Sequence, residues 1–201
     1  MSAELYIEGG ARGADSNESR SRCRKGFCKL LEKCGFAGRM PRLNACGSRE
    51  EAFKNFKTAL RSKGQSGFVA MWIDSEEPLK DVDQTWLHLK NCDGWDPPAG
   101  VNNEQVLFMT TCMETLIVAD HAALDGHYRS LQKSALPPLT DLEQRKRNEV
   151  QEKLMRATRN CKNPYEKGDR SFEILAKLDP SALDKLPSFA RTRRILSEKL
   201  T

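Results

Sequence analysis

The sequence lacks the features of a membrane protein or of a secreted, disulfide-bonded protein. No apolar run approaches the ~20 residues that a membrane-spanning helix requires, so we expect no membrane partner. The first residues contain neither a basic n-region nor an apolar h-region, and we expect no secretory signal there. The seven cysteines are odd in number and scattered, which favours reduced thiols in a cytoplasmic protein over a disulfide framework.

Several motifs of well-known enzymes are also absent. No Cys-x-x-Cys pair occurs, and neither His121 nor His127 has cysteines at zinc spacing, which excludes a structural zinc site. The sequence has no Gly-x-Ser-x-Gly elbow, no Walker loop and no Gly-x-Gly-x-x-Gly fingerprint. Acyl transfer, independent ATP hydrolysis and hydride transfer are therefore disfavoured.

The charge of the chain is positive but modest. Charged residues make up 30% of the sequence and the formal net charge is +5, a value that permits a polyanionic partner without requiring one. The basic residues gather in three runs, which are Arg20–Lys25, Arg145–Arg147 and Arg191–Arg194. Each run is most simply explained as a solvated helix face, and the sequence does not show whether the runs meet in space.

Short apolar runs alternate with amphipathic segments through the first part of the chain. Four runs have the character of strands, namely Leu5–Ile7, Arg42–Cys46, Phe68–Ile73 and Val106–Met109. The last two are continuously apolar, which is typical of strands that are buried on both faces of a parallel sheet. The alternation of strands and helices predicts right-handed β-α-β units and an α/β fold, with a parallel sheet flanked by helices.

The character of the sequence changes from Ser134. Thr140–Glu143 has the pattern of a capping box and predicts a long charged helix that reaches about Cys161. A short helix is expected over Pro187–Leu200. We therefore divide the chain into an α/β core (1–133) and a helical C-terminal extension (134–201), and we expect the extension to pack on the core because it is too small for a core of its own.

Acidic residues follow the predicted strands at the points where they end. Glu8 follows the first strand, Asp74 and Glu76 follow the third, and Glu114 lies just past the last. Open parallel sheets bind ligands outside the carboxyl ends of their strands, and carboxylates gathered there repel one another unless a cation or a proton lies between them. Oxygen ligands of this kind suit Mg²⁺ or Mn²⁺. Each acid alone is explained as well by helix capping or a turn, so the prediction depends on their joint placement.

Four segments of the chain resemble known families. The strand-Glu-Gly-Gly start (Tyr6–Gly10) and the strand-Asp-x-Glu centre (Ile73–Glu76) resemble the Toprim pattern, which has a Glu after its first strand and an Asp-x-Asp after a later one. Cys112–Asp120 resembles the Met-Glu-aromatic-apolar-apolar-Ala-Asp signature of a bacterial family, domain of unknown function 4276, and Asn163–Lys167 resembles its late Tyr-x-Lys element. That family is similar to the Toprim nucleases of phage-defence systems. The resemblance spans most of the chain, and it implies a Toprim-like parallel sheet flanked by helices.

The resemblance also implies metal-dependent phosphodiester chemistry. By position, Asp74 and Glu76 would hold Mg²⁺ or Mn²⁺, Glu8 would be the general base or a further metal ligand, and Glu114 would be an additional ligand. Two positions depart from the patterns: Glu76 replaces the commoner second Asp, and Thr115 stands where the family usually has an aromatic residue. Both departures leave every expected ligand in place.

Basic residues and partners follow from the same resemblance. Lys167 is the expected group that stabilises charge developing in the transition state, with Arg12 as the other candidate. Nucleic acid is the expected partner, and Arg12, Arg20 and Arg24 are the expected contacts with it. Proteins of this type resemble effectors controlled by an ATPase encoded alongside, which makes a partner ATPase a further expectation.

Two alternatives stay open. The chain could be a Toprim-fold interaction subunit without catalysis, which keeps its acids for structure and works with a partner. It could also be a phosphatase-like enzyme that acts on a small phosphoester. The sequence does not decide between DNA and RNA as substrate, and it leaves open whether the chain forms a homo-oligomer.

Overall fold

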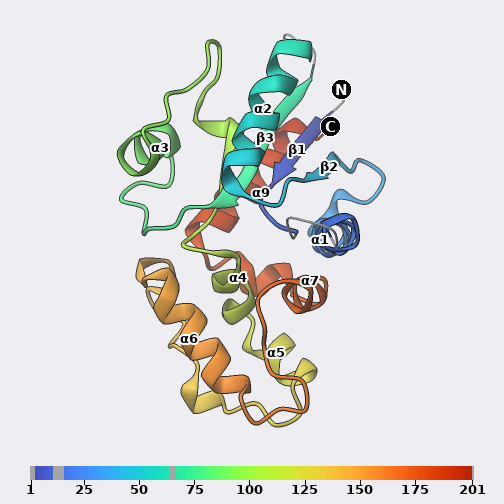
Figure 1. The fold of residues 1–201 in the computed structure, drawn as a ribbon, viewed down its shortest axis with the longest axis vertical. Coiled ribbons are helices and arrows are strands. Elements are labelled where there is room, and N and C mark those ends of the chain that lie inside the picture. Colours follow the sequence, from blue (N-terminus) through green and yellow to red (C-terminus); the bar gives the residue numbers. More distant parts are fainter. Residues whose placement is uncertain (1–2, 11–15, 64–66, 201) are drawn as a thin grey trace.

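A four-stranded parallel sheet forms the centre of the protein. The computed structural model describes residues 3–10, 16–63 and 67–200, and within them the strands are ordered β2-β1-β3-β4. Their bounds are Ala3–Ile7 for β1, Arg42–Ala45 for β2, Phe68–Asp74 for β3 and Val106–Met109 for β4. The predicted α/β fold, a parallel sheet flanked by helices, is confirmed (Figure 1).

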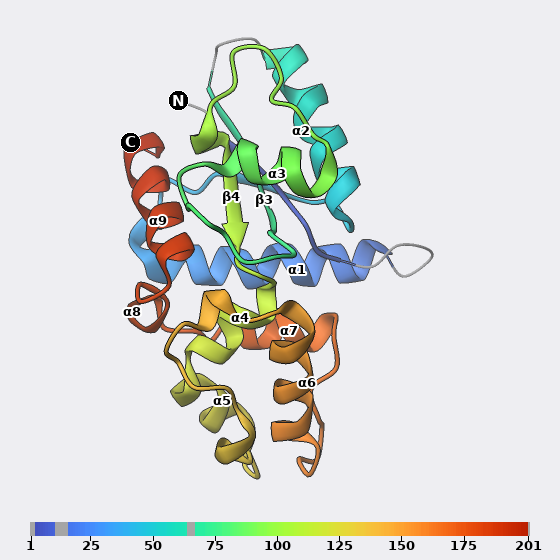
Figure 2. The ribbon, with the colours of Figure 1, turned by 90° about the vertical axis from the view of Figure 1, so that its left-hand side faces the viewer.

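Helices cover both faces of the sheet, which explains why β3 is apolar up to its last residue, Asp74, and β4 is apolar throughout. In β3, Ala70 and Trp72 join a core with α1 and α9, whereas Met71 and Ile73 point to the other face and join a core with α2 and α3. The bounds are Ser16–Leu31 for α1, Arg49–Lys63 for α2, Thr85–Asp93 for α3 and Pro187–Lys199 for α9. Figure 1 shows α3 and α1 on opposite sides of the strands, and Figure 2 shows α2 and α9 on opposite sides of them.

A second group of helices lies beyond the carboxyl ends of the strands. It consists of α4 (Met113–Ala119), α5 (His121–His127), α6 (Arg147–Thr158) and α7 (Asp169–Leu175), and α8 (Pro180–Leu183) leads from it to α9. Both ribbon views place this group below the sheet (Figures 1 and 2). One continuous core joins it to the sheet. Among residues 3–10, 16–63 and 67–200, none of the helices has the length and apolar character that crossing a bilayer requires.

The predicted long helix that begins at Thr140 is wrong in its start. The helix α6 begins at Arg147, and Asp141 has a positive φ of 52°, which interrupts any helix there. The carboxylate of Glu143 accepts hydrogen bonds from the backbone N–H and the hydroxyl of Ser188 at the start of α9. Glu143 therefore serves a contact between distant segments, and the capping-box pattern was coincidental.

The order of the strands decides where a ligand site can form. From β1 the chain adds β2 on one side, and then crosses over to add β3 and β4 on the other side. The order therefore reverses between β1 and β3, and such a switch point opens a crevice at the carboxyl ends of its two strands. Ile7 lies beside Trp72 in the register, which brings Glu8 and Asp74 to this crevice.

Candidate functional site

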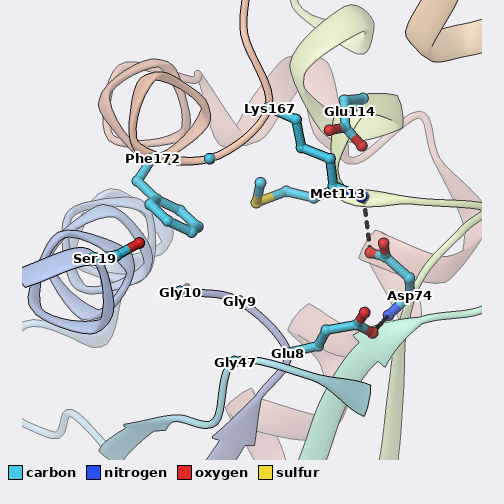
Figure 3. Close-up of a pocket in the computed structure, with 11 residues that line it drawn as sticks. Glu8, Gly9, Gly10, Ser19, Gly47, Asp74, Met113, Glu114, Lys167 and Phe172 are labelled. Atoms are coloured by element: carbon cyan, nitrogen blue, oxygen red, sulfur yellow. Dashed lines mark hydrogen bonds between the residues drawn. The ribbon is translucent and has the colours of Figure 1, made fainter. Parts of the chain in front are cut away.

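Three carboxylates meet at the switch point of the sheet. Glu8 follows β1, Asp74 ends β3 and Glu76 lies two residues further, and one carboxylate oxygen from each lies within 4.8 Å of the others. The backbone holds two of them: the N–H of Asp74 donates to Glu8 at 3.0 Å, and the N–H of Met113 donates to Asp74 Oδ1 at 2.9 Å (Figure 3). Three oxygens at this separation are within reach of one hard divalent cation.

Glu76 reaches the cluster through an unusual backbone conformation. Its φ is +66°, a region that costs a non-glycine residue on the order of 1–2 kcal/mol. The N–H of Glu76 donates to the carbonyl of Thr111 at 2.9 Å, which secures this turn. The Thr111 hydroxyl donates in turn to the carbonyl of Arg145 at 3.2 Å, so the turn is tied to the segment that leads into α6.

The start of α6 supplies a cation to the acids. The guanidinium of Arg147 forms an ion pair with Glu76 and lies 3.9 Å from Asp74 Oδ2. Its side chain is about one quarter exposed (26%), so the charge is partly screened by water. Arg147 therefore offsets part of the repulsion between the acids and offers a donor for an anionic ligand.

Burial and mutual repulsion disfavour ionisation of the acids. Burial raises the pKa of Glu8, and the hydrogen bond from Asp74 and the charge of Arg49 oppose that rise. Asp74 is only 5% exposed, and burial raises its pKa well above the usual range, with further increases from the charges of Glu8 and Glu114. A group that either binds a cation or exchanges a proton is expected at such a position.

Glu114 lies beside the cluster, but it has partners of its own. It is completely buried, and it accepts hydrogen bonds from Tyr165 Oη at 2.7 Å on one oxygen and from Gln151 Nε2 at 3.1 Å on the other. The Tyr165 hydroxyl also lies 2.8 Å from Ser171 Oγ, and burial, followed by the charge of Glu114, raises the pKa of Tyr165. Among the described residues Glu114 lies outside the group of three close oxygens. Its predicted role as a metal ligand stays a prediction.

A cavity of about 310 Å³ opens beside the acids, and four of the eight predicted site residues line it: Glu8, Asp74, Glu114 and Lys167. Its lining comprises the acids, a lysine, four glycines and apolar or hydroxyl side chains: Glu8, Gly9, Gly10, Ser19, Gly47, Asp74, Met113, Glu114, Lys167, Gly168 and Phe172. Figure 3 shows Lys167 extending toward the acids from the segment before α7. The charge of Lys167 acts to lower the pKa of both Glu8 and Asp74, as expected for an ammonium group that faces them.

The three predicted nucleic-acid contacts do not gather in one place: one lies at the edge of this cavity, one is exposed further along α1, and one lies outside the described residues. Arg20 in α1 packs on Gly10, where an added Cβ would lie 2.8 Å from Arg20 Cγ. Gly10 also has a φ of +88°, so only glycine fits between the loop and the helix. Arg24 is exposed further along α1. Arg12 lies outside the described residues.

The comparisons identify the family of the chain. A family model described as "Domain of unknown function (DUF4276)" matches residues 20–196. The chain belongs to this family. The DUF4276 match includes Asp74, Glu76, Glu114 and Lys167, whereas Glu8 precedes it. Comparisons with curated proteins and with solved structures gave no significant match.

Sequence reasoning missed two side chains of the site. Arg147 belongs to the basic run Arg145–Arg147, which was interpreted as a solvated helix face. Gln151 was not among the predicted site residues. They lie one turn apart in α6 (Arg147–Thr158), which places both on the face that meets the acids. An arginine and a glutamine at this spacing are common on exposed helices, so the sequence alone contained no specific signal for either.

Proposed function

We propose that the chain is a metal-dependent phosphodiesterase of Toprim type that hydrolyses DNA or RNA. The observation that carries the proposal is the group of three carboxylate oxygens within 4.8 Å, contributed by Glu8, Asp74 and Glu76. They come from the two strands that flank the switch point, where α/β sheets bind ligands. Asp74 lies in the interior with Glu8 beside it, so ionisation of both carboxylates raises the free energy of the folded chain unless a cation compensates their charge.

Asp74 and Glu76 are the side chains that would hold Mg²⁺ or Mn²⁺. Such a cation polarises a phosphoryl oxygen and lowers the pKa of a coordinated water. Glu8 has a raised pKa, which suits a carboxylate that takes a proton from the attacking water near neutral pH. Glu8 is also fixed by the N–H of Asp74, so its free oxygen is oriented before substrate binds.

In the proposed reaction, two basic side chains would contact the phosphate of the substrate. Lys167 lines the cavity and Arg147 lies beside Asp74 and Glu76. Charge develops on the phosphoryl oxygens during hydrolysis, and preorganised donors stabilise it. Arg20, Arg24 and Arg12 are proposed to contact the polynucleotide further from the reacting phosphate. By its resemblance to phage-defence nucleases, the chain would act as a defence effector together with a partner ATPase.

The ion pair of Arg147 favours a second candidate function. In a Toprim-fold interaction subunit without catalysis, Arg147 would be the permanent counterion of Glu76 and Asp74, and no metal would be needed. The two functions differ in metal binding. A cation that binds only the folded chain raises the free energy of unfolding by mass action, whereas the interaction subunit should show no stabilisation by Mn²⁺.

The test is metal-dependent degradation of supercoiled plasmid, single-stranded DNA and transfer RNA. Wild type is compared with Asp74→Ala and with Glu152→Ala, which removes an exposed acid from α6 as a matched control. We expect cleavage with Mg²⁺ or Mn²⁺ by wild type and Glu152→Ala, and none by Asp74→Ala. Cleavage that persists in Asp74→Ala would refute the proposal. Cleavage of only a small phosphodiester reporter would instead indicate a phosphatase-like enzyme.

A further inference from the structure

A second cavity, of about 450 Å³, lies at the far end of the helical group. Its walls come from the end of α5, the segment after α6 and the helix α7. Figure 1 shows this segment leaving α6 and passing α5 before it returns to α7. The cavity shares no lining residue with the one beside the acids, and its volume is within the range of small-molecule sites.

Unpaired positive charge dominates this cavity. Arg129, Lys162 and Arg170 line it, and Glu173 is the single acid in the lining. Among the side chains that the structure describes, none of the carboxylates lies at ion-pair distance from these three basic groups. Arg170 donates instead to the carbonyl of Pro164. Three unpaired cations around one hollow attract an anion, because each would gain a charge-assisted hydrogen bond from it.

A buried hydroxyl without a partner points to the same chemistry. Tyr128 lines the cavity and is only 3% exposed, and within the described part of the chain its Oη has no hydrogen-bond partner. An unsatisfied buried hydroxyl destabilises the folded chain, and a hydrogen-bond partner would relieve this. Burial raises the pKa of Tyr128 to about 12, with smaller effects from Arg170, Cys161 and Glu173. Tyr128 and these three residues line the cavity together, and the phenol keeps its proton near neutral pH.

The neighbouring imidazole adds a further donor. Lys177 Nζ lies 2.7 Å from His127 Nδ1, and burial together with the charge of Lys177 lowers the pKa of His127. The imidazole is therefore neutral near pH 7 and accepts at Nδ1, which leaves the proton on Nε2. His127 is part of the cavity lining, so its Nε2 proton adds a donor to the three cations, and Glu173 is the single acid beside them.

We propose that this cavity is a binding site for a phosphate-bearing small molecule. Arg129, Lys162 and Arg170 would contact the phosphate oxygens, and the Tyr128 hydroxyl would donate to one of them. A phosphate group fits better than a carboxylate because it carries up to two negative charges and three acceptor oxygens, which matches three cations and a hydroxyl. The volume of about 450 Å³ leaves room for an attached nucleoside.

The site lies on the same stretch of chain as part of the cavity beside the acids. Lys162 and Arg170 stand on either side of Tyr165 and Lys167 in the sequence. In this segment Tyr165 donates to Glu114, and Lys167 lines the other cavity. A ligand that engages Lys162 and Arg170 would therefore fix the segment that presents Lys167. This consequence rests on the proposed function, whereas the binding itself does not.

The test measures binding in EDTA, where no metal-dependent hydrolysis occurs. The probes are inorganic phosphate, adenosine 5′-monophosphate and a short oligonucleotide with and without a 5′-phosphate, titrated by calorimetry and thermal shift. Tighter binding of the monophosphate than of phosphate would identify a free nucleotide, whereas a preference for the 5′-phosphorylated oligonucleotide over the monophosphate would overturn the assignment to a small molecule and indicate a polynucleotide end. Failure of the metal-dependent cleavage would leave this result unaffected.

Variants assign the binding to the cavity. Lys162→Ala and Arg129→Ala alter exposed side chains and should fold, and each is expected to weaken binding about tenfold through loss of a charge-assisted hydrogen bond. Tyr128→Phe, which removes only the hydroxyl, is expected to weaken it by a smaller factor. Lys185→Ala removes an exposed positive charge from another part of the surface and serves as the control. Absence of binding by wild type, or equal affinities for Lys162→Ala, Arg129→Ala and Lys185→Ala, would overturn the proposal.

Discussion

Asp74 and Glu114 are two buried acids that line one cavity, yet their surroundings differ. Glu114 has a neutral donor on each oxygen, from Tyr165 and Gln151. Asp74 has one backbone donor, and its second oxygen faces other acids and a guanidinium 3.9 Å away. Glu114 is thus already compensated by hydrogen bonds, whereas the group around Asp74 is short of donors and gains from an added cation. The supply of donors, more than burial, separates a structural acid from a candidate metal ligand.

The largest expected difference between the two acids is in metal binding. Mn²⁺ at 100 times its Kd should stabilise wild type by about 2.7 kcal/mol, which corresponds to a rise in Tm of about 5–10 °C for a chain of this size. We expect Asp74→Asn to abolish the rise and Glu114→Gln to retain it, as measured by differential scanning fluorimetry. If both variants lost the rise in Tm equally, Glu114 would also be a metal ligand, and the distinction between the two acids would be wrong.

Removal of the Tyr165 hydroxyl should destabilise the chain without affecting the metal. Tyr165→Phe leaves Glu114, which is fully buried, with one donor fewer, and the expected loss is about 1–3 kcal/mol in the free energy of unfolding. Urea denaturation in EDTA measures it. Tyr6→Phe, whose hydroxyl bonds to Glu4 at a half-buried position, is the control and should cost less. A loss of the Mn²⁺ effect in Tyr165→Phe would show that the two acids are not independent.

Arg147→Gln sharpens the comparison by removing the protein's own cation from the acids. Glu76 and Asp74 then repel each other with less compensation, and we expect a loss of about 1 kcal/mol in metal-free stability, the upper range for a partly exposed pair. The stabilisation by Mn²⁺ should persist or increase, because the metal competes with one cation fewer. Equal metal-free stabilities of wild type and Arg147→Gln would show that Arg147 is not an effective counterion.

A change of pH tests the same repulsion between the acids without a substitution. The pKa values of Glu8 and Asp74 are raised in the folded chain, so the folded state binds protons more readily than the unfolded state does. Their contribution to stability is therefore fully present below the ordinary carboxyl pKa of ~4 and is lost as pH rises through the raised values. Urea midpoints in EDTA should show this decline, and Asp74→Asn should reduce it. A decline of the same size in Asp74→Asn would assign it to other groups.

The strands could be predicted because their signal is local. Phe68–Ile73 and Val106–Met109 are apolar runs that end at a turn, and the structure confirms them as β3 and β4 within one residue. The helix predicted from Thr140 failed because Glu143 bonds to Ser188, 45 residues away. A capping pattern depends only on residues that are close in sequence, and a contact with a residue far along the chain can override it.

The sequence by itself determined the four strands, the acids at their ends and the resemblance to the family that the match over residues 20–196 then established. Only the tertiary structure decided which acids meet. It placed β1 beside β3, which brought Glu8 to Asp74, and it brought Arg147 to Glu76 and Tyr165 to Glu114 across 71 and 51 residues. The physical reason is that hydrophobic periodicity fixes which face of an element is buried, whereas partners so distant in sequence are chosen by the packing of the whole chain.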